Sequence, residues 1–263
     1  MEDVKLVDIT LDNVFDYGVC GYKNRKNKGL QRKVEWLKNR FSEGMKIKTI
    51  ITENDGSQGL IEYIPGEYCW RPVNAKGYMF IHCIFSGFKK VYKRHGYGSM
   101  LIDECIKDAK QQHMQGVAVV TRKSGWMADN RIFFKKGFEV VDSAAPDFDL
   151  LVKKFNKDAP DPKFKGNWEQ TFKQYSDGLT IIWSGQCPYP SNYAEELAET
   201  AEKEFNVTAN LVELKTCEEA QNSPCPFGVF CVVYNGKVVA GTPISKGRLR
   251  NILKKELTKI TVN

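Results

Sequence analysis

More than any other segment, a short loop with two glycines limits how this chain can fold. Its residues are Lys93, Arg94, His95, Gly96, Tyr97, Gly98 and Ser99. An apolar run of strand length precedes the loop at residues 78–85, and a helical pattern follows it at residues 100–111. The glycines allow a tight turn and close backbone approach, and the first N–H groups of the helix point outward with the positive end of its dipole. This order predicts an anion site; the less specific interpretation is a Gly-rich turn that opens an ordinary helix.

The spacing within the loop excludes two common phosphate-binding motifs. It is not the G-x-x-x-x-G-K-[ST] of nucleoside triphosphatases, and Ile102 falls near the place of the third glycine of a dinucleotide loop. The loop instead has a basic residue, then two residues of any type, Gly, one residue of any type and a second Gly. That pattern resembles the pyrophosphate loop of the GNAT (Gcn5-related) N-acetyltransferases. Lys93 stands where this family usually has Arg or Gln, and it keeps the positive charge.

Two later segments follow in the order of the same family. Residues 116–121 are apolar and rich in β-branched side chains, which predicts a strand. Residues 130–139 resemble the second half of the family signature, a helix with an aromatic pair that leads through Lys, Gly137 and Phe into a strand. Gly137 alone is equally explained by a position just past a helix end. Over residues 78–141 the resemblance implies the GNAT fold, an α/β (α+β) architecture with a mixed, mostly antiparallel sheet.

Composition indicates a folded globular protein, with 263 residues of which 42% are hydrophobic and 27% charged. The first residues are acidic where a secretory signal would be basic and then apolar. No run approaches the roughly 20 apolar residues that cross a bilayer. We therefore expect a cytoplasmic protein that has no membrane partner.

The net charge of +7 comes from scattered lysines and arginines with two local groups. Lys89 and Lys90 adjoin the glycine loop and suit an anionic cofactor such as coenzyme A. The group at residues 23–28 is interpreted as a solvated surface rather than a nucleic-acid patch, because few aromatic residues interleave with it. The eight cysteines lack the paired spacing of a metal site, so we expect no bound metal and mostly buried thiols, with Cys83 and Cys105 as core candidates.

A second domain is predicted in the C-terminal part of the chain. The GNAT-like domain covers residues 1–155, residues 156–178 with their two prolines are interpreted as a linker, and residues 179–263 form a small α/β domain. The predicted elements of this domain are a short apolar strand that starts at 179, strands at 210–214 and 229–234, helices at about 191–205 and 245–257, and a hairpin turn at Asn235-Gly236. Their order resembles the thioredoxin fold.

A cysteine marks the first strand-to-helix junction of that domain. The motif Cys187-Pro188-Tyr189-Pro190 resembles a glutaredoxin motif whose second cysteine is replaced by proline, so a dithiol cycle within it is excluded. Cys187 is then either a single thiolate stabilised by the helix N-terminus or an inert thiol in an inherited fold. If Pro226 is the cis-proline that faces this junction in thioredoxins, the resemblance places Cys225 beside Cys187 as a resolving partner. A GNAT region followed by such a domain resembles the YoaP-type acetyltransferases.

The resemblance also implies how the chemistry is divided among residues. Acetyl transfer needs aligned reactants and donors for a developing oxyanion. In GNAT enzymes the splayed end of the central strand supplies backbone N–H groups, which implies Ile84 and Phe85 here. A tyrosine of the later helix often protonates the leaving thiolate, but Phe133 or Phe134 occupies that position and neither has a hydroxyl.

Three sources of the catalytic base remain open. Glu62 and His82 each lie in a strand-like run expected to line the acceptor site. His82 has the more suitable ordinary pKa, whereas glutamate is the more usual base of the family. A lone strand histidine is also commonly a hydrogen-bonded structural residue. Deprotonation through water is the third option.

Two loops combine tryptophan with a cation, Trp70 beside Arg71 and Trp126 after Arg122. Such exposed pairs are typical of recognition surfaces, and packing between the two domains explains them equally well.

The leading hypothesis is an N-acetyltransferase that moves an acetyl group from acetyl-coenzyme A to a primary amine of a small molecule or peptide. The alternative is a monothiol redox or mixed-disulfide module acting through Cys187, with the GNAT half used to bind coenzyme A. A third hypothesis is a binding protein that has lost catalysis. The sequence leaves the acceptor and the oligomeric state open.

Overall fold

The computed structural model describes residues 4–87, 89–123, 125–166, 168 and 173–261, and the side chains of these as far as residue 258. It divides into two compact units, residues 1–69 with 73–165, and residues 70–72 with 166–263. The ends of the two predicted domains, residues 1–3 and 262–263, lie outside the described residues, as do residues 167 and 169–172 of the predicted linker.

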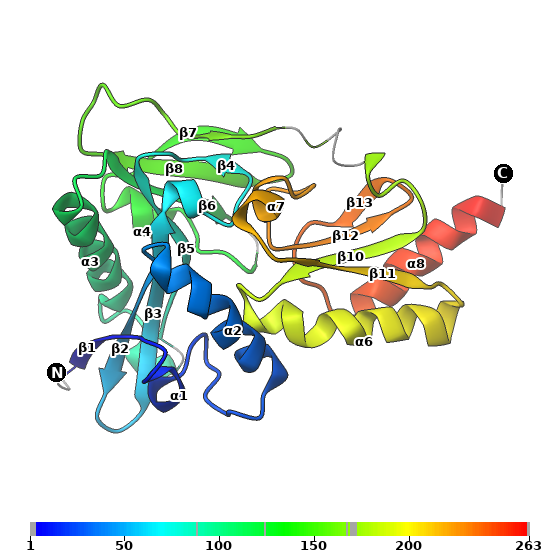
Figure 1. Ribbon diagram of the computed structural model, residues 1–263, viewed down its shortest axis with the longest axis horizontal. Coiled ribbons are helices and arrows are strands. Elements are labelled where there is room, and N and C mark those ends of the chain that lie inside the picture. The colour runs from blue at the N-terminus through cyan, green and yellow to red at the C-terminus, as the bar shows by residue number, and fades with distance from the viewer. Residues whose placement is uncertain (1–3, 88, 124, 167, 169–172, 262–263) are drawn as a thin grey trace. The chain divides into compact units, whose positions relative to one another are not determined.

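The first unit is built on a seven-stranded sheet (Figure 1). Its strands, in spatial order, are β1 (Val4–Asp8), β2 (Lys46–Thr52), β3 (Gly56–Pro65), β5 (Tyr78–Ser86), β6 (Gly116–Arg122), β8 (Phe148–Lys154) and β7 (Glu139–Ala144). Every neighbouring pair is antiparallel except β5 and β6, which are parallel. The prediction of a mixed, mostly antiparallel sheet is therefore confirmed.

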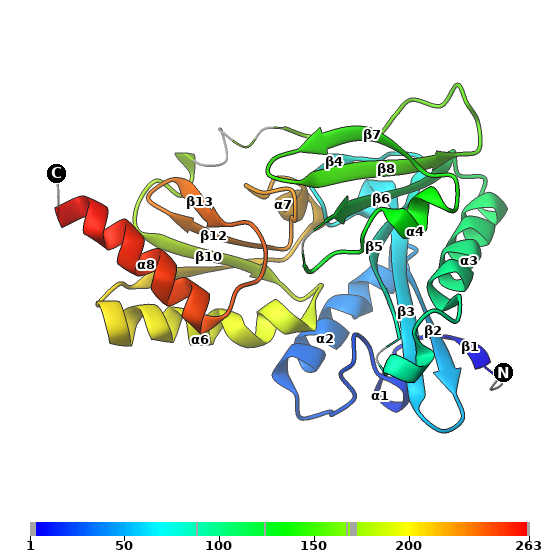
Figure 2. The same ribbon diagram turned by 180° about the vertical axis from the view of Figure 1, so that it is seen from behind.

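Helices and short segments complete this unit (Figure 2). They are α1 (Val14–Tyr17), α2 (Lys28–Ser42), α3 (Tyr97–Gln111), α4 (Arg131–Phe134) and the 3-10 turns η1 (Gly66–Tyr68) and η2 (Lys90–Tyr92). A two-stranded ribbon joins β4 (Val73–Asn74) to β9 (Lys163–Phe164). Since β9 falls within residues 156–178, part of the predicted linker is a strand of the first unit.

Strand alternation decides which helix each side chain of β3 meets, because successive residues point to opposite faces of a sheet. Tyr63 faces α3, where its hydroxyl donates a 2.5 Å hydrogen bond to Asp108. The preceding residue, Glu62, faces α2 and forms an ion pair with Lys33. The two faces of the sheet therefore carry two separate groups of buried charges.

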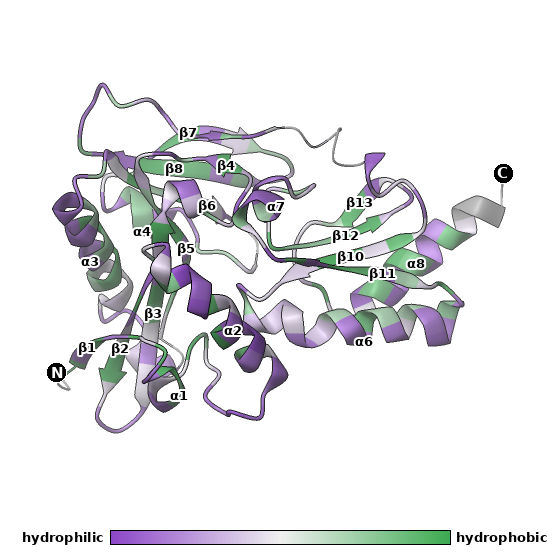
Figure 3. Cartoon of the chain, in the orientation of Figure 1, coloured by the Kyte–Doolittle hydropathy of each residue, from purple (hydrophilic) through white to green (hydrophobic). Residues whose placement is uncertain are grey.

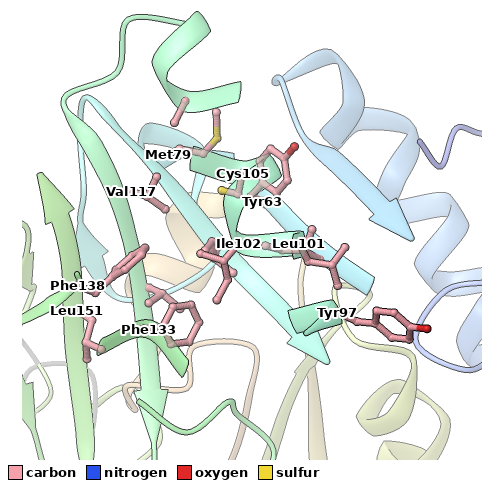
Figure 4. Close-up of a cluster of buried hydrophobic side chains, with 14 of the residues drawn as sticks. Tyr63, Met79, Tyr97, Leu101, Ile102, Cys105, Val117, Phe133, Phe138 and Leu151 are labelled. Carbon is pink, nitrogen blue, oxygen red and sulfur yellow. The ribbon is translucent and has the colours of Figure 1, made fainter. Parts of the chain in front are cut away.

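The apolar core of the unit lies between α3 and the sheet (Figure 4). Hydrophobic and hydrophilic residues alternate along α3 (Figure 3), and its buried residues include Leu101, Ile102 and Cys105, which is the pattern of an amphipathic helix. Cys105 is fully buried there, as predicted, whereas Cys83 is only half-buried. The fully buried members of the core include Ile61, Met79, Leu101, Ile102, Val117, Phe133 and Leu151.

The second unit has a four-stranded sheet in the order β11 (Ala209–Leu214), β10 (Leu179–Ser184), β12 (Phe230–Tyr234) and β13 (Lys237–Ala240). β10 and β11 are parallel, and the other two pairs are antiparallel. Its helices are α6 (Pro188–Phe205), α7 (Cys217–Gln221) and α8 (Lys246–Thr261). α6 packs against β10, β11 and α8, so α6 and α8 lie together in both views (Figures 1 and 2).

The predicted elements of this unit agree with the observed ones to within a few residues. Among the first residues of these elements, the largest difference between prediction and structure is in α6, which begins at Pro188 rather than at residue 191. Proline is accommodated in the first helical turn, where an N–H would have no partner within the helix. The hairpin between β12 and β13 is confirmed, and both Asn235 and Gly236 have positive φ as a tight turn of this kind requires.

None of the helices in the described part of the chain has the length and apolar character that a membrane-spanning segment needs.

Candidate active site

The parallel strands β5 and β6 separate halfway along β5. They pair from Tyr78 with Gly116 to Ile81 with Val119, and the ladder ends there although both strands continue. On its other edge β5 stays paired with β3, but Glu62 is opposite Cys83 while Tyr63 is opposite Ile81. His82 is thus the extra residue of a β-bulge at the point of separation. Bulges reorient side chains and often lie next to active sites.

The register determines which backbone groups of β5 face away from β3. Gly87 donates a 2.7 Å hydrogen bond from its backbone N–H to the carbonyl of Gln58, so the backbone N–H of Gly87 points toward β3. Alternation along an antiparallel edge then turns Phe85 toward β3 as well, and turns Ile84 and Ser86 toward the side that β6 has left. Of the two residues predicted to be donors, Ile84 therefore has its backbone N–H on the side that β6 has left, as Ser86 does, whereas the backbone N–H of Phe85 faces β3.

The glycine loop connects this strand end to α3. Residues 93–96 are exposed, and Gly96 is the N-cap of the helix with φ of +80°. Among the described residues no side chain caps this terminus. The N–H groups of the first turn, at Tyr97, Gly98 and Ser99, have no partners within an α-helix and carry the positive end of its dipole. The exposed cations Lys93 and Arg94 add positive charge at the same end.

The two loop positions are glycines for different structural reasons. A methyl group on Gly96 would meet nothing within 4 Å, so its glycine is explained by the positive φ. A methyl group on Gly98 would lie 2.5 Å from Ile132 Cδ1 of α4 and 3.3 Å from Ser86 Oγ of β5. Gly98 therefore allows β5, α3 and α4 to meet closely, and the end of β5 lies directly against the first turn of α3.

An acidic side chain anchors the segment that leads into the loop. Asp55, from the turn between β2 and β3, accepts a 2.8 Å hydrogen bond from the Tyr92 hydroxyl and forms an ion pair with Lys89. Hydrogen bonds from Lys89 and Tyr92 lower the pKa of Asp55. The segment that leads into the loop is thus attached to the sheet through Asp55 and Tyr92, which the sequence did not single out, and through Lys89, which it had assigned to the cofactor.

The two candidate bases lie side by side on the α2 face of the sheet. His82 Nδ1 is 3.3 Å from Glu62 Oε1, and Lys33 Nζ contacts Glu62 Oε2. All three side chains are excluded from solvent. Aromatic rings enclose the group, since Trp36 and Phe80 lie 6.2 and 5.9 Å from the His82 ring centroid.

Electrostatics distinguishes the roles of these side chains. Burial raises the pKa of Glu62, but the positive charge of Lys33 and the hydrogen bond with His82 outweigh it and lower the pKa to about 2. A carboxylate with so low a pKa is a weak proton acceptor at neutral pH. Glu62 is therefore suited to hold a charge and orient a neighbour. Lys33 was not among the predicted residues, although its place on the buried stripe of α2 between Leu30 and Leu37 was a usable signal.

The aromatic pair of α4 occupies two environments. Phe133 is fully buried and packs edge-on against Phe138 with ring centroids 5.3 Å apart. Phe134 is 44% exposed. Neither ring supplies a proton, as the sequence indicated.

The cysteines of the second unit lie in different surroundings. Cys187 is half-buried and is the N-cap of α6. Cys225 is buried, and its thiol donates to the carbonyl of Phe230 at 3.3 Å. Burial raises the pKa of Cys225, yet hydrogen bonds from Cys231 and backbone N–H groups lower it overall. Ala145–Pro146 is the cis peptide among the described residues, so the bond before Pro226 is trans and does not reproduce the cis-proline of thioredoxins.

The two predicted tryptophan loops also differ. Trp70 is fully buried and Arg71 stacks over the Phe227 ring at 5.0 Å, which corrects the expectation of an exposed loop there. Trp126 is 51% exposed, as expected of a surface residue.

Comparisons with known proteins give the family of the chain. The family model described as YoaP-like matches residues 209–251. The chain is 31% identical over 251 residues to the "Uncharacterized N-acetyltransferase YoaP" of Bacillus subtilis (strain 168), a match that covers 94% of this chain and 97% of that protein. By this relationship the chain falls in the N-acetyltransferase class. Within that class it belongs to the YoaP family.

Solved acetyltransferases are similar to part of the chain. A GNAT-family acetyltransferase from Staphylococcus aureus Mu50 is 14% identical, with a TM-score of 0.44 over 59% of this chain and 100% of that one. YncA from Salmonella typhimurium, solved with its cofactor acetyl-CoA, is 14% identical, with a TM-score of 0.41 over 60% of this chain and 98% of that one.

Proposed function

We propose that this chain transfers an acetyl group from acetyl-coenzyme A to a primary amine of a small molecule or peptide. The observation that carries the proposal is the contact between two elements. The end of β5 that no longer pairs with β6, at Ser86, lies against the first turn of α3, at Gly98. Backbone donors suited to a thioester carbonyl are thus next to backbone donors suited to a pyrophosphate.

The cofactor-holding residues are those of the glycine loop. The N–H groups of Tyr97, Gly98 and Ser99 would face the pyrophosphate, and the charges of Lys93 and Arg94 would offset its negative charge. His95 and Gly96 are the remaining exposed residues of the loop before α3. When bound, acetyl-coenzyme A supplies an activated acetyl group as a thioester. The N–H of Ile84, together with that of Ser86, stabilises negative charge at the acetyl oxygen.

We assign removal of the amine proton to His82. Imidazole is the side chain that most often serves as a general base, whereas Glu62, with its pKa lowered to about 2, is too weakly basic. The ring lies in the bulge where β5 leaves β6, so transfer takes place at the strand separation, directly or through one water. Phe133 and Phe134 have no hydroxyl with which to protonate the leaving thiolate. A thiol pKa of about 8.5 allows the thiolate to leave unprotonated, which lowers the rate without preventing the reaction.

We also propose that the second unit is thioredoxin-like. Its strand order β11-β10-β12-β13, the parallel β10–β11 pair and the helix after β10 support this assignment. The trans bond before Pro226 and the buried partners of Cys225 leave Cys187 as its candidate for thiol chemistry.

Calorimetric titration with acetyl-coenzyme A tests the proposal. We expect micromolar binding by the wild type and none by Gly98→Glu, which puts a negative charge in the first turn of α3. The control is Gly98→Ala with Ile132→Ala, which leaves room for the new methyl group and adds no charge; it should bind. Absence of binding by the wild type would overturn the proposed function. Binding would be followed by a screen of polyamines, peptides and amine-bearing drugs, with release of the coenzyme A thiol as the readout.

A further inference from the structure

We propose that Lys33 is a positioning residue that acts through Glu62 on His82. In this arrangement Lys33 keeps Glu62 ionised, and Glu62 accepts the proton on His82 Nδ1, which leaves Nε2 as the nitrogen that takes the proton of the acceptor amine. The inference rests on the proposed function, because it gives the assigned base its orientation.

The position of Lys33 is unusual for a lysine. Its side chain lies on the buried stripe of α2, and none of it is exposed to solvent. Its Nζ contacts Glu62 and lies 4.2 Å from the centre of the Trp36 ring, so a carboxylate and an aromatic face together replace the water it has lost. Lysine is almost never fully buried unless it is paired.

Stability alone does not explain this pair. Removing two charges from water costs several kcal/mol per ion, and replacing a buried ion pair by apolar residues of similar volume is often neutral or stabilising. The neighbouring positions of the stripe, Leu30 and Leu37, show that α2 can be apolar here. A charged pair at this place is instead explained by what it does to the third member, His82.

The charges around the histidine come from three elements. α2 contributes Lys33 and, beyond the Trp36 ring at 5.6 Å, Arg40, which is itself paired with Glu43. β3 contributes Glu62, and β5 contributes His82 itself. Neutralising Lys33 would leave the Glu62 carboxylate without its nearest cation, so the His82 ring would hold its proton more strongly.

Two substitutions separate charge from packing. Lys33→Met keeps an unbranched chain of similar length and removes the charge, whereas Lys33→Arg keeps the charge. We expect the pKa of His82 to rise by about one unit in Lys33→Met and to stay within a few tenths in Lys33→Arg. Removing both charges, with Lys33→Met and Glu62→Gln together, should bring the His82 titration back toward the wild-type value.

Long-range ¹H–¹⁵N correlation spectra of the imidazole rings measure this directly, because the chain has only three histidines. His95 and His113 serve as internal controls whose titrations should not change. The wild-type spectrum should show a proton on Nδ1 of His82 and none on Nε2 at neutral pH. A proton on Nε2 instead, or an unchanged His82 titration in Lys33→Met, would overturn the proposal.

Activity gives the second readout. The acid limb of the pH profile for coenzyme A release should move up by the same amount in Lys33→Met, and Lys33→Arg should restore its position. A lowered rate with an unmoved pH profile would mean that Lys33 has a packing role only. Since the ring spectra need no cofactor, a wild type that failed to bind acetyl-coenzyme A would refute the proposed function while the His82 orientation could still be confirmed or refuted.

Discussion

In both units a helix follows a strand, α3 after β5 and α6 after β10, but the first turns of the two helices differ in their backbone donors. In α3 the first three helical residues are Tyr97, Gly98 and Ser99, and each has a backbone N–H. In α6 they are Pro188, Tyr189 and Pro190, of which two have none. The first turn of α6 therefore offers fewer backbone donors to an anion than the first turn of α3, and its N-cap residue is Cys187.

The interiors of the two units also differ, in the charged groups that they bury. On the α2 face the first unit buries a charged pair against a histidine, and on the α3 face it buries Asp108 against Tyr63. The sheet of the second unit packs apolar side chains and the Cys231 thiol, whose pKa is raised by burial. Sensitivity to pH and to anionic ligands should thus belong to the first unit.

The largest effect should come from Glu62→Gln, which leaves Lys33 buried without its anion. We expect a loss of about 3–5 kcal/mol in the free energy of unfolding at pH 7, measured by urea denaturation. Because the pKa of Glu62 is lowered from 4.5 to about 2 on folding, its contribution is complete above pH 4.5 and disappears as the pH falls toward 2, which amounts to about 3 kcal/mol in the wild type.

The matched control is in the second unit, where Glu204 forms an exposed ion pair with Arg250. Glu204→Gln should leave the free energy of unfolding nearly unchanged, because an exposed ion pair contributes little to stability. Equal losses in the two variants would contradict the contrast between the two interiors.

Charge reversal at the glycine loop should have the next largest effect. Lys93→Glu with Arg94→Glu is expected to weaken acetyl-coenzyme A binding about 100-fold, or about 3 kcal/mol, because attraction for the pyrophosphate becomes repulsion. Calorimetry at two salt concentrations checks this, since the loss should shrink at high salt. Lys237→Glu with Lys246→Glu changes the net charge equally in the second unit and should leave the affinity unchanged.

Gly98→Ala tests the packing of α3 against α4 without changing the charge of the loop. The methyl group would press on Ile132, and such overpacking costs about 2 kcal/mol of stability. Thermal unfolding should show a lower Tm that Ile132→Ala partly restores in the double variant. If Ile132→Ala gave no recovery, the close meeting of α3 and α4 would not be the reason for the glycine.

The smallest effect is expected at Cys187. Cys187→Ser should change acetyl-coenzyme A affinity and the rate of coenzyme A release by less than about twofold, because the α6 terminus takes no part in holding the cofactor. An assay of thiol exchange on the same sample would show whether a separate activity is lost. Loss of acetyl transfer in this variant would mean that the two helix termini serve one reaction.

Local patterns were sufficient for much of the fold. Periodicity located α3 and the strands on both sides of it, and the Asn235-Gly236 pair located a hairpin, because each of these depends on a few consecutive residues. Local patterns could not decide the burial of Trp70, which depends on residues distant in sequence, or show that β9 pairs with β4 within the segment interpreted as a linker.

The residues of the candidate site also differ in whether local sequence could predict them. Gly96 was predictable because a positive φ is a local demand. The preference for Ile84 and Ser86 over Phe85 needed the register with β3, which one hydrogen bond from Gly87 establishes. The pairing of Lys33 with Glu62 joins a helix to a strand across the fold, so a sequence pattern could indicate only that a lysine stood on an apolar stripe.

The discontinuity of the second unit has a consequence for how the protein is made. Trp70, Arg71 and Pro72 belong to that unit, yet they lie within the stretch of chain that builds the first. During synthesis they leave the ribosome well before Phe227, the ring on which Arg71 rests. The second unit therefore stays incomplete until Phe227 has been translated, and a gene fragment that ends at residue 165 would encode residues 70–72 without the unit to which they belong.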